Sequence, residues 1–451
     1  MSSATTRVQT LRGLIQLLVN TSELVIKEWE TEEQQPATHE SQVIPASGLP
    51  PHELFEAQRV IRAACGMWMD LVEDPRIRLL EISLSYAFSQ ALDTTVRAGV
   101  PDILAEAESP SDGISAAELC RRTGIDEHKL VRLMRMLCNG GIYNEVKPLQ
   151  FSNTRVSRVL ADNAAAKACS SVYSTKLIVE AVEHLPATLL DPEMTYSTSP
   201  KETAFQKAHK TTGTLWDYIE KGDTSDPAVL EVREMFPLAM VGEGQMCSPS
   251  LIADFPWGDL GEATVVDVGG GVGSMCLELA KMFPRLRFVV EDLPVSIEKA
   301  KSIWNTEVPG AIEAGRTQLI THDFFHEQPV KNAAVYFLRY ILHDWPDDAC
   351  VLILSELREA MGSDSRILVA DMIIHPPLGS RHLKSAPAPL PANYGRADAF
   401  KSMHDMVMLS VFNGSERTPG QLGVIAERAG LTIEKIWECR GPVSITELRL
   451  L

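Results

Sequence analysis

The chain has 451 residues, of which 45% are hydrophobic and 23% are charged, as expected for a globular protein of two to three domains. Its formal net charge of −18 argues against a general affinity for nucleic acid or for anionic membrane surfaces. No hydrophobic run reaches the length of about 20 residues that a membrane-spanning helix needs, and no signal peptide is recognisable. The eight cysteines are dispersed without zinc-binding spacing, so we expect thiols in a reducing, cytoplasmic compartment.

The first part of the chain predicts helices. Residues 11–30 are amphipathic at helical spacing, and residues 31–52 are polar and Pro-rich, as in a linker. Residues 53–108 predict further helices, one of which is apolar around most of its circumference. Such a helix is buried either in its own domain or against a partner subunit. We therefore expect an N-terminal helix and linker over 1–52 and a helical domain over 53–245.

Residues 114–160 predict two helices around a Gly turn, then a Gly-Gly pair and two short strands. This order is the winged-helix pattern, and its basic residues would suit DNA binding. The alternative is a structural or dimerising module whose charges are solvated. We favour this alternative, because the chain is strongly acidic and no basic tail accompanies the segment.

A different pattern begins at residue 263, where apolar strands alternate with helices. Strands are predicted to begin near residues 263, 287, 317, 333 and 365, and two more lie at 432–439 and 444–450. This alternation predicts an α/β Rossmann-like domain over 246–451, with a mostly parallel seven-stranded sheet and helices on both faces. Residues 375–397 are Pro-rich and predict a mobile surface insertion.

The first predicted strand runs into a glycine turn, "VVDVGGGVGS", at residues 265–274. Glycines let a ligand approach a strand-to-helix turn, and the helix N-terminus offers free N–H groups. A dinucleotide fingerprint needs G-x-G-x-x-G, but here Gly269, Gly271 and Gly273 are followed by Ser274. Asp267 lies in the strand itself. The spacing favours a nucleoside ligand without a pyrophosphate.

Acidic residues end the following strands. Asp292 lies about 20 residues past the glycines, where an acid can bind ribose hydroxyls, and Asp323 with Phe324 could contact an adenine ring. Each could instead be a solvated loop carboxylate. The next strand ends at "LRYILHDWPDD", in which His343 could be a structural histidine or a base. Since parallel strands end at one crevice, Asp371 should lie near His343, which predicts a general base held by carboxylates.

Taken in order and spacing, "VVDVGGGVGS", "EDLP", "HDFF", "LRYILHDWPDDAC", "ILVADMII" and "DMVMLSVFNGSERT" resemble a known family. They are similar to S-adenosylmethionine-dependent O-methyltransferases of the plant caffeate/flavonoid type. The long N-terminal region most resembles the fungal branch that methylates phenols in secondary-metabolite pathways. The resemblance covers the chain from about residue 80 and is most specific in 263–417.

The resemblance implies S-adenosylmethionine as cofactor and a homodimer whose N-terminal winged-helix domain dimerises. It implies His343 as catalytic base, oriented by Asp371 and Glu416; the family usually has Glu where Asp371 stands. Position 339 is usually Lys and here is Arg339, which keeps the charge but changes the geometry. The implied cofactor-binding residues are Asp267, Gly269, Gly271, Gly273, Asp292, Leu293, Asp323, Phe324, Arg339 and Trp345. The candidates for the acceptor pocket are Trp216, Phe236, Met240 and Met408.

These observations predict methyl transfer to a hydroxyl, phenolic in class, of a small aromatic metabolite, without a metal ion and without nucleic-acid or membrane partners. Three alternatives stay open. A family member could bind the cofactor but catalyse a pericyclic or other non-methylating step. An NAD-dependent oxidoreductase could use the same sheet, although Ser274 and the lack of a second nucleotide-binding half count against it. A winged-helix regulator is the third alternative.

Overall fold

A computed structural model describes residues 3–34, 48–109, 111–223 and 225–451. Contacts divide the chain into two compact units. The first unit comprises residues 1–72, 185–207 and 246–451, and the second comprises residues 73–184 and 208–245. Most of the predicted linker at 31–52 lies outside the described residues, because the description stops at residue 34 and resumes at 48.

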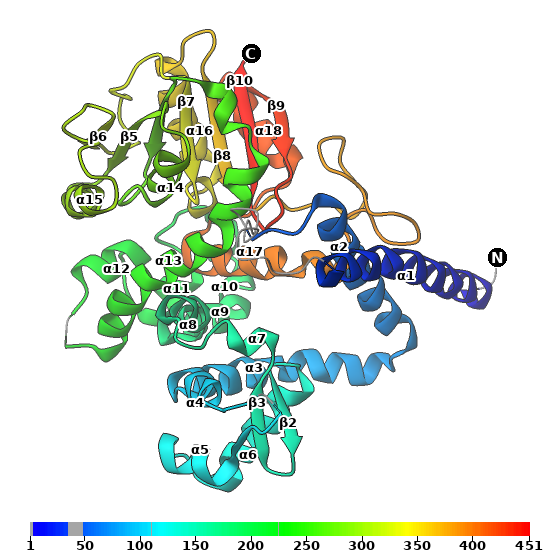
Figure 1. The fold of residues 1–451 in the computed structure, drawn as a ribbon. Coiled ribbons are helices and arrows are strands. Elements are labelled where there is room, and N and C mark those ends of the chain that lie inside the picture. The colour runs from blue at the N-terminus through cyan, green and yellow to red at the C-terminus, as the bar shows by residue number, and fades with distance from the viewer. Residues whose placement is uncertain (1–2, 35–47, 110, 224) are drawn as a thin grey trace. The chain divides into compact units, whose positions relative to one another are not determined.

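The first unit contains a seven-stranded sheet with the strand order β6-β5-β4-β7-β8-β10-β9 (Figure 1). Strands β4 to β8 pair in parallel, whereas β10 runs antiparallel to both β8 and β9. This topology confirms the predicted mostly parallel sheet. The strands are β4 (Thr264–Val268), β5 (Arg287–Asp292), β6 (Thr317–Thr321), β7 (Val335–Arg339), β8 (Arg366–Asp371), β9 (Leu431–Trp437) and β10 (Ser444–Leu450).

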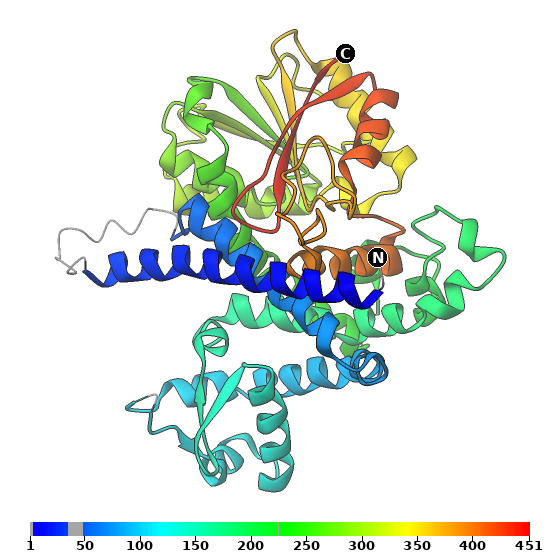
Figure 2. The same cartoon turned by 90° about the vertical axis from the view of Figure 1, so that its right-hand side faces the viewer.

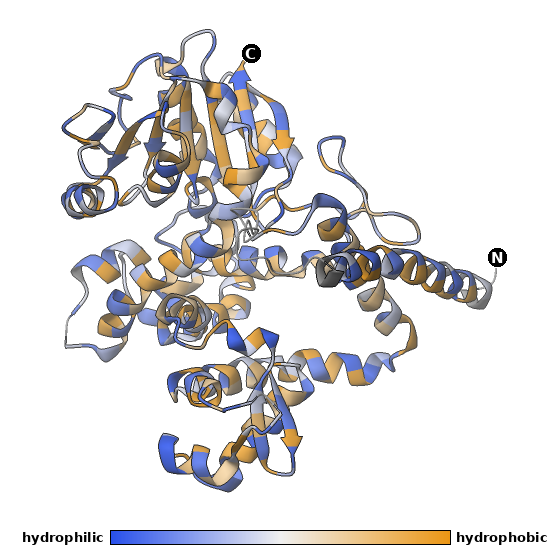
Figure 3. Ribbon diagram, in the orientation of Figure 1, coloured by the Kyte–Doolittle hydropathy of each residue, from blue (hydrophilic) through white to orange (hydrophobic). Residues whose placement is uncertain are grey.

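Alternate residues of these strands are buried on opposite faces of the sheet, since side chains alternate along a strand. Val265 and Phe337 pack with Trp304 of α15 on one face, while Val266 and Tyr336 pack with residues of α16 and α18 on the other. Figure 3 shows hydrophobic residues along the central strands. The helices are α14 (Ser274–Met282), α15 (Pro294–Glu307), α16 (Asp347–Ala360), α17 (Ala399–Phe412) and α18 (Pro419–Arg428).

Helices α1 (Ser3–Gln34) and α2 (His52–Val72) pack on each other in the same unit (Figure 2). Leu14 of α1 and Val60 of α2 form a buried cluster with Leu390 and Tyr394 of the Pro-rich segment. The segment 375–397 is thus not only a surface insertion. Leu390 and Tyr394 are covered by the N-terminal helices, a long-range contact that local composition does not reveal.

The second unit contains the winged-helix pattern as predicted. Its sheet has the order β1-β3-β2, and Leu119, Leu130, Tyr143 and Phe151 form part of its core. The elements are α3 (Pro75–Arg97), α4 (Val100–Ala105), β1 (Ile114–Ser115), α5 (Ala116–Thr123), α6 (Glu127–Asn139), β2 (Tyr143–Lys147), β3 (Gln150–Asn153), α7 (Arg155–Arg158), α8 (Ala164–Ser171), α9 (Lys176–Glu183) and α12 (Leu215–Lys221). Helix α13 (Pro227–Asp254) begins in this unit and ends in the first. The first unit also holds α10 (Leu185–Leu189), and α11 (Ala204–His209) lies at the boundary.

Several basic side chains of the winged-helix region are paired with acids of the same unit. Arg121 contacts Glu118, Arg122 contacts Glu106, Arg135 contacts Glu145 and Lys147 contacts Asp112. These exposed pairs contribute little stability, but they offset the positive charge that a nucleic acid would need. The pairing favours a structural role for the region. In the described part of the chain, no helix combines the length and apolarity needed to cross a bilayer.

Candidate active site

The glycine turn joins β4 to α14 at the carboxyl edge of the sheet. Gly269 has φ of +67°, in the left-handed region that favours glycine, and a Cβ there would lie 2.8 Å from Ile341 Cδ1. By contrast, a Cβ on Gly271, where φ is +62°, would meet nothing within 4 Å. The turn is therefore closed on its protein side and open above Gly271. This arrangement fits a ligand that approaches the backbone.

Asp292, at the end of β5, is hydrogen-bonded to the glycine turn. Its Oδ2 accepts the N–H of Gly271 at 2.8 Å, and its Oδ1 accepts the N–H of Leu293 at 2.8 Å. A carboxylate has about four lone-pair sites, so acceptor capacity is left for hydroxyl groups. The acid predicted to bind ribose is thus held at the turn predicted to carry the nucleoside. Leu293, the next residue, is half exposed to solvent (50%).

Three aromatic rings lie together after β6 and β7. Trp345 meets Phe324 edge-on with ring centroids 6.1 Å apart, and meets Phe325 edge-on at 4.8 Å. Phe324 also borders the glycine turn, since a Cβ on Gly269 would lie 3.2 Å from its ring. Asp323, beside them, keeps a side chain that is 45% exposed. The structure therefore brings the predicted adenine contacts to the same turn.

Arg339 ends β7 and donates to two serines. Its Nη1 donates to Ser248 Oγ at 3.1 Å and its Nη2 donates to Ser274 Oγ at 2.7 Å. Ser274 thus uses its hydroxyl where a dinucleotide fingerprint would have a glycine. Burial raises the pKa of Asp267 to about 6, although the positive charge of Arg339 acts in the opposite direction.

His343 lies in the short 3₁₀ helix η4 (Leu342–Asp344) that follows β7. The chain turns at Tyr340, which adopts φ of +57°, an unusual conformation for a bulky residue. The ring of Tyr340 stacks on His343 with centroids 5.3 Å apart. His343 is buried, with 6% of its surface exposed. The turn after the buried strand therefore carries His343 into an interior cluster of acidic side chains.

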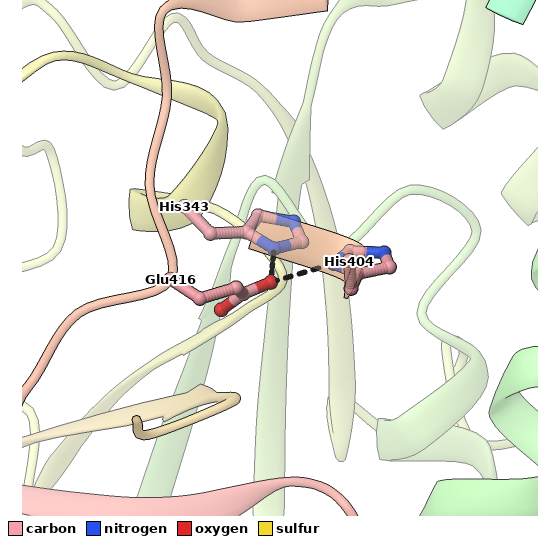
Figure 4. A group of neighbouring side chains, drawn as sticks. All are labelled: His343, His404 and Glu416. Atoms are coloured by element: carbon pink, nitrogen blue, oxygen red, sulfur yellow. Dashed lines mark hydrogen bonds and ion pairs between the residues drawn. The ribbon is translucent and has the colours of Figure 1, made fainter. Parts of the chain in front are cut away.

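Glu416 accepts hydrogen bonds from two histidines through one oxygen. Its Oε1 lies 2.7 Å from His343 Nδ1 and 2.8 Å from His404 Nδ1 (Figure 4). Burial alone would lower the pKa of His343, but the negative charges of Glu416 and Asp344 outweigh burial and raise it to about 10. Burial would raise the pKa of Glu416, but His343 and His404 lower it to about 2. Glu416 is therefore an ionised partner of His343.

Asp371 and Asp344 are the other acids of the cluster. Burial raises the pKa of Asp371 to about 6, and its Oδ1 is buried without a hydrogen-bond partner. Of the two acids predicted to orient His343, only Glu416 is hydrogen-bonded to it. Asp371 is one methylene shorter than the Glu usual at this position, and it acts on His343 through its charge. Asp344, which sequence reasoning gave no role, has Oδ1 at 3.5 Å from His343 Nε2.

The turn that carries His343 is fastened from the loop after α17. Arg417 donates through Nη1 to the carbonyl of Leu342 and through Nη2 to that of Trp345, both at 2.7 Å. A Cβ on Gly414 would lie 2.0 Å from the carbonyl oxygen of His343, so only glycine allows this approach. Like Asp344, His404 and Arg417 are residues that sequence reasoning missed. The spacing of His404 to Met408, which places both on one face of a helix, is the one local signal for His404.

The four predicted pocket residues fall in different units. Met408 is buried in α17 of the first unit, whereas Trp216 and Phe236 meet edge-on in the second, with ring centroids 5.4 Å apart. Met240 of the second unit is 38% exposed. Their assignment to an acceptor pocket stays a prediction.

His343, His404 and Glu416 also offer donor atoms that all lie within 4.8 Å of one another, a spacing at which a metal ion can be held. Each nitrogen is at hydrogen-bonding distance from the same carboxylate oxygen. Hydrogen bonds are therefore sufficient to account for the arrangement.

Comparisons with known proteins identify the family to which the chain belongs. Residues 197–432 match the O-methyltransferase domain and residues 80–163 match the O-methyltransferase dimerisation domain. The O-methyltransferase gedA of Aspergillus terreus is 39% identical over 97% of each chain. The O-methyltransferase tpcA of Aspergillus fumigatus is 37% identical over 96% of this chain and 94% of that one. The chain belongs to the O-methyltransferase family.

A solved structure shares the fold. CalO1, a methyltransferase in calicheamicin biosynthesis in its S-adenosylhomocysteine-bound form, gives a TM-score of 0.66 at 24% identity, covering 84% of this chain and 98% of that one. The family's cofactor is S-adenosylmethionine, and the glycine turn with Asp292 fits its nucleoside. The chain is an S-adenosylmethionine-dependent O-methyltransferase with a domain for self-association.

Proposed function

We propose that this enzyme methylates a phenolic hydroxyl of a small aromatic secondary metabolite, with His343 as general base and without a metal ion. The observation that carries the proposal is the buried hydrogen bond between His343 Nδ1 and Glu416 Oε1, at 2.7 Å. An ionised carboxylate only accepts hydrogen bonds, so Nδ1 carries a proton, and in the neutral form of the ring Nε2 offers a lone pair. A phenol O–H that reaches Nε2 can therefore lose its proton to it.

When bound, S-adenosylmethionine supplies a methyl group on a positively charged sulfur. The acceptor O–H bond breaks as its proton moves to Nε2, the O–CH₃ bond forms, and the S–CH₃ bond breaks to leave a neutral thioether. Glu416 stabilises the imidazolium that forms on His343. General-base assistance of this kind contributes about 10²–10⁴-fold, and a dry, well-oriented site supplies the remainder.

The residues proposed to hold the cofactor belong to one edge of the sheet. Asp292 would accept from the ribose, and Asp323 would accept from the adenine amino group. The rings of Phe324 and Trp345 would cover the adenine, and Arg339 would contact the cofactor from the end of β7. The remaining members of this proposed set are Asp267, Gly269, Gly271, Gly273 and Leu293.

The acceptor and the partner subunit complete the proposal. Trp216, Phe236, Met240 and Met408 are proposed to contact the aromatic acceptor. We propose a homodimer, supported by the dimerisation domain at 80–163 and by exposed Leu80, Ile82, Leu84 and Tyr86 on α3. The domain bounds 1–52, 53–245 and 246–451 are part of the same proposal. A cytoplasmic location is supported by eight cysteines that form no disulfide.

The test is a methyl-transfer assay with isotope-labelled S-adenosylmethionine and acceptors from monocyclic phenols to fused aromatic polyketides. A product one labelled methyl heavier, with its phenol blocked, is the expected result. Methylation of carbon or nitrogen only would overturn the choice of acceptor group. An acceptor rearranged without gain of a methyl would instead favour the non-methylating alternative. Prior treatment with a chelator separates metal-assisted from metal-free transfer.

A further inference from the structure

We propose that His404 is a positioning residue, which shares Glu416 with His343 and thereby lowers the basicity of the catalytic base. The inference rests on the proposed role of His343. The three side chains come from separate parts of the chain: His343 from η4 after β7, His404 from α17, and Glu416 from the loop after α17. Their convergence on one oxygen is a property of the fold.

The geometry puts both imidazoles in equivalent contact with the carboxylate. His404 Nδ1 lies 2.8 Å from Glu416 Oε1, and His343 Nδ1 lies 2.7 Å from the same atom. The rings are nearly parallel, at 15°, with centroids 5.7 Å apart. His404 is as buried as His343, and the Glu416 side chain is inaccessible to solvent (0% exposed). Water therefore does not screen this contact.

Two hydrogen bonds to one ionised oxygen fix the protonation of both rings. Because the carboxylate can only accept, His404 must carry its proton on Nδ1, as His343 does. A proton taken up by His343 then cannot pass through Oε1 to His404, whose facing nitrogen is already protonated. His404 thus keeps the captured proton on His343. The hydrogen bond that His404 donates also partly neutralises the Glu416 carboxylate, which then stabilises the His343 imidazolium less.

Glu416 is held in place independently of His404. Its backbone N–H donates to Asp405 Oδ1 at 2.8 Å, and the neighbouring Ser415 N–H donates to the His343 carbonyl at 2.9 Å. Replacement of His404 should therefore leave the carboxylate beside His343. The main consequence is electrostatic: Glu416 gives its full charge to His343, whose pKa rises.

Other titratable groups surround His343, and none of them is replaced in such a variant. Asp344 faces it from η4, Asp371 from the end of β8, and Tyr340 stacks on it after β7. Arg417, from the loop after α17, acts on Asp371. His404 also lowers the pKa of Asp344, so the part of the effect that passes through Glu416 is isolated by combining the His404 variants with Glu416→Gln.

The experiment is a double-mutant cycle on His404 and Glu416, with kcat/KM measured against pH. His404→Phe removes the donor, His404→Leu is a second donor-free variant, and His404→Asn keeps an N–H near the position of Nδ1. On the rising limb of the profile, His404→Phe and His404→Leu are expected to lower kcat/KM about tenfold, the effect of a one-unit rise in the pKa of the base. His404→Asn should stay within about twofold. In a Glu416→Gln background His404→Phe should change kcat/KM less than about twofold.

An equal loss in both backgrounds, or no displacement of the limb, would overturn the proposal. His375→Asn is the matched control, since His375 is equally buried (2% exposed) but is hydrogen-bonded to backbone carbonyls; its limb should not move. A stoichiometric metal ion that is lost in His404→Phe would also overturn it.

An NMR titration of histidine-labelled enzyme bound to S-adenosylhomocysteine distinguishes failure of this inference from failure of the proposed function. This titration reads the pKa of His343 without turnover. A raised pKa in His404→Phe supports the coupling even if His343→Ala remains active, and an unchanged or lowered pKa refutes it.

Discussion

Glu416→Gln tests how much the charge of Glu416 contributes to the proposed role of His343 as general base. The variant keeps the size of the side chain but removes the charge that lies 2.7 Å from His343 Nδ1. A hydrogen bond to a charged group is worth about 1.5–3 kcal/mol, and one pKa unit corresponds to about 1.36 kcal/mol. The pKa of His343, raised to about 10 in the native enzyme, should therefore fall by about one to two units.

Two effects on turnover follow and can be separated. The rising limb of the pH profile should move to lower pH, because a less basic histidine is deprotonated earlier. The plateau should fall by about 10²-fold, because the imidazolium formed in the reaction loses its counter-charge. Stability should fall by about 1–3 kcal/mol, since the amide NH₂ takes the place of a buried carboxylate oxygen that has no partner, Oε2.

The assay is labelled methyl transfer with a phenolic acceptor from pH 6 to 10, with S-adenosylhomocysteine affinity measured by calorimetry as a control. That affinity should change less than about twofold, because Glu416 is not among the proposed cofactor contacts. A limb that stays in place or moves to higher pH would refute the electrostatic reasoning. A plateau within twofold of the native value would show that Glu416 does not assist the base.

Three further predictions concern the proposed cofactor site and the proposal that transfer needs no metal ion. Gly269→Ala should weaken S-adenosylhomocysteine binding at least tenfold and lower the melting temperature, because its Cβ would lie 2.8 Å from Ile341 Cδ1 at a positive φ; native binding in calorimetry would contradict the fit at the turn. Asp292→Asn should raise the KM for S-adenosylmethionine about tenfold while kcat changes little, since the glycine turn loses a charged acceptor; a loss in kcat alone would argue against a binding role. Dialysis against EDTA should leave turnover unchanged, and activity restored only by added Mg²⁺ or Zn²⁺ would disprove the metal-free proposal.

The parallel sheet could be predicted because its information is local. Each strand is an apolar run; β4 ends at Val268 before the glycine turn, and β5 to β8 end at the polar residues Asp292, Thr321, Arg339 and Asp371. Parallel strands bring such ends together, so the residues proposed to bind the cofactor could be grouped from the sequence. The N-terminal cover of residues 375–397 could not be predicted, because Pro-rich composition describes the backbone and not what packs on Tyr394.

The base and its partners show the same limit. His343 could be selected from its place after β7, and Glu416 from the family resemblance. The contact between them, and the sharing of Glu416 with His404, depend on how α17 and the loop after it approach the turn at His343. The local sequence "MHDMVMLS" does not predict this approach. The close contact between Gly414 and the His343 carbonyl depends on segments that are far apart in the chain.

The central claim is that His343 accepts the acceptor's proton during methyl transfer. The most direct measurement is a single-turnover experiment with labelled S-adenosylmethionine and a phenolic acceptor, comparing the native enzyme with His343→Ala at matched cofactor occupancy. The account predicts that methyl transfer slows by at least about 10²-fold while the Kd for S-adenosylhomocysteine changes less than about twofold. A variant that transfers methyl at close to the native rate would contradict it.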